Sequence, residues 1–156
     1  MIGAAGTAVR CQAGGYPQDG IGDIDGATAR DVTESLGEAR RRGPVTVSLD
    51  RLDTFGGGRP RALFARAVPG PELMDLQEEH ERLVRRAGVE AERRKFSPHI
   101  TLARLRDASA AAVAGYIAER GAFPRLAFAA ERFVLYSARE SVGGGPYLVE
   151  AAYPLV

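Results

Sequence analysis

The sequence has 156 residues, enough for one domain with a substantial core and too few for two independent domains. Its 21 basic and 20 acidic residues give a net charge of +1, which excludes the basic excess of proteins that coat long nucleic acids but remains compatible with a small phosphorylated ligand or an RNA end. The single cysteine, Cys11, excludes an internal disulfide and a thiolate metal site.

No stretch approaches the roughly 18–20 consecutive apolar residues that cross a membrane. The first residues also lack the basic region followed by an apolar stretch that is typical of a signal peptide. We therefore expect a single domain over residues 1–156 that is cytoplasmic, makes no membrane contact and is a monomer.

The first predicted helix follows an irregular start. Residues 1–22 consist of small residues and turn formers without a hydrophobic period, which predicts a loose segment with no strand. Residues 26–42 carry apolar positions at helical spacing, with Asp25 or Thr28 as the candidate N-cap. Gly43-Pro44 is expected to end this helix.

A hairpin and a long helix are expected next. Residues 45–52 alternate apolar and polar side chains, a glycine-rich turn follows, and residues 61–68 are the predicted returning strand. Residues 71–88 predict a helix that begins at Pro71 and ends at Gly88. His80 falls on its apolar stripe and is interpreted as a packing residue.

The remaining pattern predicts a strand over 98–105, an alanine-rich helix over 108–120, and strands near 126–138 and 147–155 joined by a turn at 143–145. The order is helix, hairpin, helix, strand, helix, hairpin. Two units of this kind predict an α+β protein with two pseudo-equivalent lobes.

The segment RRKFSPHITLAR (93–104) carries the candidate chemistry. On a strand His99 and Thr101 project from the same face, while Ile100 and Leu102 project toward a core. An imidazole titrates near neutral pH and can move a proton at a phosphorus centre, and a threonine hydroxyl can hold a phosphate oxygen beside it. From the residues alone, a histidine and a threonine at this spacing on a strand are more often an ordinary half-exposed pair.

PHITLAR resembles the second HxT motif of the bacterial and archaeal RNA 2′,3′-cyclic phosphodiesterases, once named 2′-5′ RNA ligases, of the two-histidine phosphoesterase superfamily. The resemblance extends over residues 21–156. It includes IGDID (21–25) before a helix, DTFGG with RPR (53–61), and the long helix that ends at Gly88.

The resemblance implies an α+β fold of two pseudo-symmetric antiparallel lobes with flanking helices around a central groove. It implies hydrolysis of an RNA-terminal 2′,3′-cyclic phosphate to a 2′-phosphate without metal or cofactor, with RNA 3′ ends or small 2′,3′-cyclic nucleotides as partners. One histidine acts as general base and another as general acid, while two threonines hold the phosphate. His99 would be one of these catalytic histidines, and Thr101 a phosphate-binding threonine.

Several side chains near the motif are weaker candidates. Arg93, Arg94 and Arg104 flank His99 and are candidate substrate-binding residues, because a guanidinium can bind phosphate or stack on a base. Arg104 shares strand parity with Ile100, so it reaches the His99 face only if the strand twists or ends there. Phe55 is expected to pack in the core rather than to stack on a base.

The family's first motif, approximately HxTLxF(L/I)G, is not recognisable. Aligned on Gly22, Gly15 stands where the histidine belongs and Pro17 where the threonine belongs, and neither side chain can take the role. A frame change or misassigned start is one hypothesis, and a lineage that lost half its site is the other. Because one general acid or base contributes about 10²–10⁴-fold in rate, we expect impaired hydrolysis. An inactive RNA-end or cyclic-nucleotide binding module, and a non-functional gene product, are the alternatives.

Overall fold

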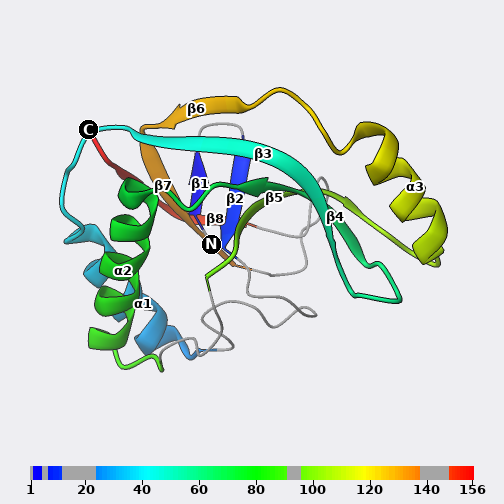
Figure 1. Cartoon of the computed structure of the whole chain (residues 1–156). Coiled ribbons are helices and arrows are strands. Elements are labelled where there is room, and N and C mark those ends of the chain that lie inside the picture. Colours follow the sequence, from blue (N-terminus) through cyan, green and yellow to red (C-terminus); the bar gives the residue numbers. More distant parts are fainter. Residues whose placement is uncertain (1, 5–6, 12–23, 91–95, 138–147) are drawn as a thin grey trace.

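The computed structural model of the chain describes residues 2–4, 7–11, 24–90, 96–137 and 148–156 (Figure 1). Its elements are β1 (Ile2–Ala4), β2 (Thr7–Cys11), α1 (Gly26–Gly37), β3 (Val45–Phe55), β4 (Ala62–Ala67), α2 (Pro71–Arg86), β5 (Pro98–Arg104), α3 (Ala110–Arg120), β6 (Leu126–Ala130), β7 (Arg132–Ser137) and β8 (Leu148–Pro154). The fold is α+β, as the sequence predicted. In the described ranges no helix has the length and apolar character to cross a bilayer.

Two short strands lie in the segment that was expected to be irregular. β1 and β2 form an antiparallel pair, and β2 continues the sheet by pairing with β5, where Arg10 lies opposite His99. The prediction of no strand before residue 21 is therefore wrong for residues 2–4 and 7–11. These strands depend on hydrogen bonds to a partner strand, which local hydrophobic periodicity does not report. Residues 12–23, where the first HxT motif was sought, lie outside the described residues.

Helix α1 ends earlier than predicted. Asp25 is its N-cap, accepting hydrogen bonds from the backbone N–H groups of Ala27 (2.7 Å) and Thr28 (3.0 Å). The helix stops at Gly37 rather than continuing to residue 42. The backbone N–H groups of Arg42 and Gly43 instead donate to the carbonyl of Leu155, both at 3.0 Å. Tertiary hydrogen bonds thus replace the helical bonds that local propensity favoured.

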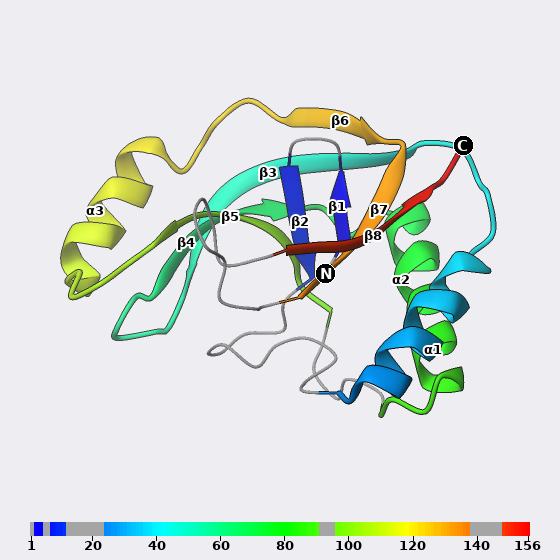
Figure 2. The ribbon, with the colours of Figure 1, turned by 180° about the vertical axis from the view of Figure 1, so that it is seen from behind.

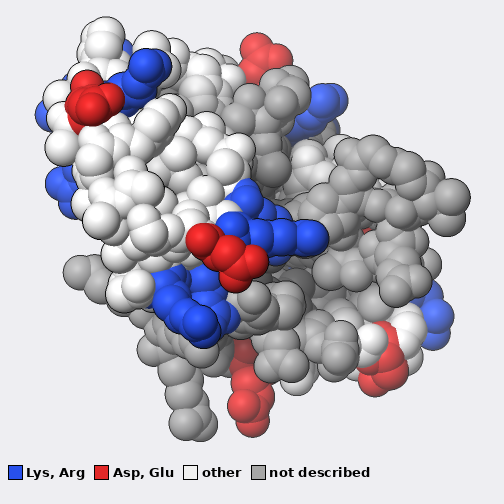
Figure 3. Space-filling model, turned by 90° about the vertical axis from the view of Figure 1, so that its right-hand side faces the viewer, with Lys and Arg blue, Asp and Glu red and all other residues white. Residues whose placement is uncertain are grey.

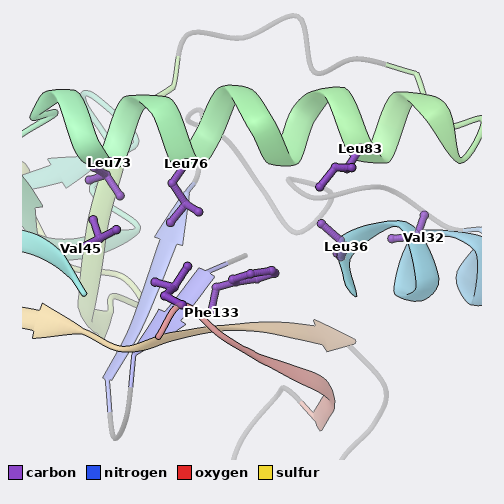
Figure 4. Close-up of a cluster of buried hydrophobic side chains, with 8 residues drawn as sticks. Val32, Leu36, Val45, Leu73, Leu76, Leu83 and Phe133 are labelled. Carbon is purple, nitrogen blue, oxygen red and sulfur yellow. The ribbon is translucent and has the colours of Figure 1, made fainter. Parts of the chain in front are cut away.

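The apolar faces of α1 and α2 close over one end of the sheet (Figure 4). On the predicted stripe of α2, Leu73 and Leu76 face Val45 and Phe133 from the strands, and Leu83 faces Leu36 of α1 (Figure 4). Pro71 begins this helix and Gly88, with a φ of 84°, follows its end, so both predicted boundaries are confirmed. This cluster holds the helical layer of one lobe against the sheet.

The larger sheet has the strand order β1-β2-β5-β4-β3-β6, and every recorded pairing in it is antiparallel. β3 is longer than predicted and curves from the α1/α2 end toward α3 (Figures 1 and 2). A second apolar cluster lies on one face of this sheet; its buried members are Val47, Leu49, Ala65, Ala67, Ile100 and Ala130. The opposite face of the same strands carries His99.

The glycine turn between β3 and β4 closes a hairpin, as predicted, with Phe55 paired to Ala62. Gly56 has a φ of 110°, a region that side chains with a Cβ rarely adopt. A Cβ on Gly56 would lie 2.1 Å from the carbonyl oxygen of Arg59. This position therefore requires glycine for both conformation and space.

The region predicted as one strand over 126–138 is two strands in different sheets. β6 pairs with β3, whereas β7 pairs with β8 in a separate two-stranded sheet. The chain turns at Glu131, whose carbonyl accepts a hydrogen bond from the Leu155 N–H at 2.8 Å. Ala130 and Phe133, on either side of this corner, belong to different core clusters. Burial of both side chains therefore fixes the point at which the chain passes from one sheet to the other. The turn expected at 143–145 lies outside the described residues.

Candidate active site

Strand β5 carries His99 and Thr101 on one face of the curled sheet. Ile100, between them, is buried in the cluster of the opposite face, so the alternation predicted from the sequence is present. In the register with β4, Arg66 lies opposite His99 and Phe64 lies opposite Thr101. The two candidate residues thus share a face with Phe64 and Arg66.

The imidazole of His99 is held in one orientation. Its Nδ1 atom lies 2.8 Å from the carbonyl oxygen of Ser97. Because a carbonyl only accepts hydrogen bonds, Nδ1 carries the proton in neutral His99, and Nε2 carries the lone pair. The residue is 0% exposed. Its backbone neighbour therefore fixes which ring nitrogen has the lone pair that can accept a proton.

Two aromatic rings pack against His99. Phe55 meets the imidazole edge-on, with ring centroids 4.9 Å apart, and Phe64 lies at 5.1 Å. Phe55 and Phe64 stack on each other at 4.1 Å. Phe55 is half-buried and packs on His99 and Phe64 rather than in either core cluster, so the expectation of core packing is wrong for this side chain. Phe64, which the sequence analysis did not single out, is the second wall, and strand alternation over 61–68 was the signal that it shares a face with Arg66.

The strand alternation predicted that Leu102 projects into the core, and this prediction is wrong. Its exposed fraction is 55%. Thr101 pairs with Phe64 but Ala103 pairs with Leu63, so Leu102 is an extra residue at a register shift in β5. A bulged residue loses its place in the alternation, which explains its exposure.

The same register shift changes the position of Arg104. Beyond it Arg104 pairs with Ala62, which also pairs with Phe55, one of the rings on His99. Directly opposed residues project from the same face. Arg104 therefore lies in the row of the His99 face rather than in that of Ile100, and it is exposed. Arg93 and Arg94 lie outside the described residues, so their part in the site stays a prediction.

The structure does not bring the second histidine to this site. His80 is 7% exposed in α2, where its ring lies 4.1 Å from that of Phe133. Burial is the main cause that lowers the pKa of His80 to about 3, and the positive charge of Arg42 acts in the same direction. The interpretation of His80 as a packing residue is confirmed.

An ion pair that the sequence analysis missed lies on the His99 face. Arg66 donates from Nε to Oδ1 of Asp50 at 2.9 Å, and its Nη2 donates to Oδ2. The hydrogen bond from Arg66 lowers the pKa of Asp50, and the same bond raises the pKa of Arg66. The sequence signal was Arg66 two positions after Phe64 on a predicted strand, but no pattern identified its partner.

Comparison with known proteins places this arrangement in a family. A family model described as LigT like phosphoesterase matches residues 67–147, which are 81 of the 156 residues. The RNA 2′,3′-cyclic phosphodiesterase of Bacillus subtilis (strain 168) is 33% identical over 86 residues, covering 54% of this chain and 47% of that protein. The chain thus matches about half the length of this curated relative.

Solved structures agree with the fold. A crystal structure of a Thermus thermophilus protein superposes with a TM-score of 0.64 at 25% identity, over 86% of this chain and 74% of that one. E. coli LigT in complex with 3′-AMP superposes with a TM-score of 0.61 at 22% identity, over 85% and 71%. Together with the family match over half of the sequence, they establish that the chain belongs to the LigT-like phosphoesterases.

Proposed function

We propose that the chain hydrolyses the 2′,3′-cyclic phosphate at RNA 3′ ends to a 2′-phosphate, with His99 exchanging the proton and Thr101 holding the phosphate. The observation that carries this proposal is the pairing of the two side chains on one face of β5, with the Nδ1 proton of His99 directed to Ser97. The name of the Bacillus subtilis relative supports the substrate class.

In the proposed reaction, a water oxygen bonds to phosphorus and the P–O3′ bond breaks. One proton leaves the attacking water and one reaches O3′. The Nε2 lone pair of His99 can accept the first proton, or a protonated Nε2 can deliver the second. The Thr101 hydroxyl donates to a non-bridging oxygen and keeps phosphorus beside the imidazole. We propose that none of these steps uses a metal ion.

A single imidazole serves only one of the two proton transfers at a time. Gly15 and Pro17 stand where the family's other motif would supply a second histidine and threonine. Solvent water must then complete the other transfer, which costs about 10²–10⁴-fold in rate. We propose that hydrolysis by this chain is slow for that reason.

The second candidate function is an inactive module that binds RNA ends or cyclic nucleotides. Gly15 and Pro17 favour it, because neither side chain can replace a general acid or a phosphate clamp. The two functions differ in one measurable respect, which is whether removal of His99 abolishes turnover or leaves the background rate unchanged.

The deciding experiment compares wild type, His99→Ala and His80→Leu on uridine 2′,3′-cyclic phosphate, with and without EDTA. We expect wild-type turnover that falls by about 10²-fold or more in His99→Ala and persists in EDTA. His80→Leu is the matched control, because His80 lies in the α2 core and should leave turnover unchanged. Equal rates in wild type and His99→Ala, with binding retained, would favour the inactive module. Turnover that EDTA abolishes would contradict metal independence.

The expectations of a cytoplasmic, monomeric protein remain predictions. On the side shown in Figure 3, basic and acidic side chains lie next to one another among the coloured residues. This distribution fits the net charge of +1 and recognition of a short ligand rather than a long nucleic acid.

A further inference from the structure

The row of residues on β4 beside His99 supplies a cation to this face of the sheet. Arg66 is in register with His99, and the neighbouring Ala65 is in register with Ile100 in the opposite cluster. Arg66 therefore projects from the same face as His99. Its side chain is 33% exposed, so a ligand on this face can reach the guanidinium.

A bulge in β3 sets the direction of the Arg66 side chain. Leu49 pairs with Ala67 and Arg51 pairs with Arg66, which leaves Asp50 as the extra residue at the register shift. Bulges redirect side chains and are frequent beside active sites. The Asp50 carboxylate accepts hydrogen bonds from Nε and Nη2 of Arg66. Because Asp50 is on β3, these bonds hold the guanidinium on the β3 side of β4, away from β5. Within the described residues no acceptor is recorded for its Nη1 group.

In the described part of the chain, the charged groups that act on this ion pair have a net positive charge. Arg51 and Arg66 are directly opposed on neighbouring strands, an arrangement that is destabilising for like charges. Among the described residues, Asp50 is the recorded hydrogen-bond partner of Arg66, and Asp53 also acts on Arg66 electrostatically. The positive charges of Arg51 and Arg125 act on Asp50. These three arginines and two aspartates sum to one positive charge. An anion placed against Arg66 would relieve the repulsion.

We propose that Arg66, oriented by Asp50, binds a backbone phosphate of an RNA chain whose terminal phosphate lies at His99. Neighbouring strands are about 4.8 Å apart, so Asp50 on β3 lies two strand spacings, or about 10 Å, from β5. Because Asp50 holds the guanidinium on the β3 side of β4, we assign Arg66 to the next phosphate along the chain rather than to the phosphate at the imidazole. The proposal rests on the proposed function and adds a preference for oligonucleotides over mononucleotides.

The test measures binding of a 5′-fluorescein-labelled uridine trinucleotide with a terminal 2′-phosphate, by anisotropy over a range of salt concentrations. Uridine 2′-phosphate, which has no backbone phosphate, is measured as a competitor. We expect Arg66→Gln to weaken trinucleotide binding about tenfold. The slope of log K against log salt should become shallower by about 0.7, the value for one phosphate contact in a single strand. Affinity for the mononucleotide should not change.

Further variants separate ligand binding from stability. Arg66→Lys retains the charge and should retain the salt slope, while the double variant Asp50→Asn/Arg66→Gln removes both charges and should behave as Arg66→Gln does. The matched control is Arg86→Gln, because Arg86 forms a surface ion pair with Glu38 in the α1/α2 lobe. This variant should bind as wild type does. Thermal unfolding of each variant identifies any loss of folded protein.

The outcome also separates this inference from the proposed function. Unchanged trinucleotide affinity and salt slope in folded Arg66→Gln, or equal losses for both ligands, would overturn the role of Arg66. Thr101→Val should lower the affinity for both ligands, because both carry the terminal phosphate. If Thr101→Val changes neither affinity while Arg66→Gln still alters the salt slope, the terminal-phosphate site is wrong and the backbone-phosphate site stands.

Discussion

The buried His80 should make the stability of the protein depend on pH. The ring lies against Phe133, and its Nε2 atom is buried without a hydrogen-bond partner among the described residues. Burial favours the neutral imidazole and lowers the pKa of His80 from 6.5 to about 3. Replacement by leucine keeps an apolar side chain at this place in the stripe and removes the titration.

The sign and size of this pH dependence of the unfolding free energy follow from proton linkage. Between pH 6.5 and 3 the unfolded chain binds a proton at residue 80 that the folded chain does not, so the free energy of unfolding falls as pH falls. Each pH unit corresponds to about 1.4 kcal/mol. At pH 5 the free energy of unfolding is therefore about 2 kcal/mol lower than at pH 8. This is a substantial share of the typical unfolding free energy of about 5–15 kcal/mol. His80→Leu should also gain about 1 kcal/mol at pH 8, because it removes an unpartnered buried polar atom.

The assay is urea unfolding of wild type and His80→Leu at several pH values from 5 to 8. The difference between their unfolding free energies should grow as pH falls, with the slope given above. Leu83→Met, a volume-conserving change in the same cluster, is the control and should shift stability equally at every pH. Parallel pH curves for wild type and His80→Leu would refute a neutral, desolvated His80.

Two further substitutions test the framework that holds the site. Gly56→Ala should lower the melting temperature and destabilise by about 2 kcal/mol or more, since the new Cβ would meet the Arg59 carbonyl at 2.1 Å on a backbone with positive φ; an unchanged melting temperature would contradict the hairpin geometry. Leu76→Ala removes a side chain that is 1% exposed and should cost about 2–5 kcal/mol in urea unfolding; a cost below about 1 kcal/mol would show that α2 does not pack as described.

Sequence periodicity predicted those elements whose boundaries are local. Pro71 and Gly88 delimit α2 because proline is suited to a first turn and glycine to the left-handed position after a helix. The end of α1 and the break at Glu131 were not predictable in this way. Each depends on hydrogen bonds with Leu155, far away in the sequence, and a periodic pattern contains no information on such a partner.

The same distinction between local and long-range determinants applies to the residues of the candidate site. The shared face of His99 and Thr101 was predictable, because two residues that are two positions apart on one strand project from the same side. Arg66 was missed because its relation to His99 requires the register of β4 on β5, and its partner Asp50 requires the bulge in β3. For an equivalent reason, the face on which Arg104 lies was not predictable. A single extra residue, Leu102, reverses the alternation beyond it, and no composition signal marks that residue.

Described residues from the strand of His99 and from the neighbouring hairpin contribute to the orientation of its imidazole. Ser97 fixes the Nδ1 proton from two positions earlier in the chain, and Phe55 and Phe64 hold the ring from the neighbouring hairpin. Ile100 anchors the same strand from the opposite face. These contacts come from β3, β4 and the segment around β5, and they are the part of the candidate site that the described residues supply.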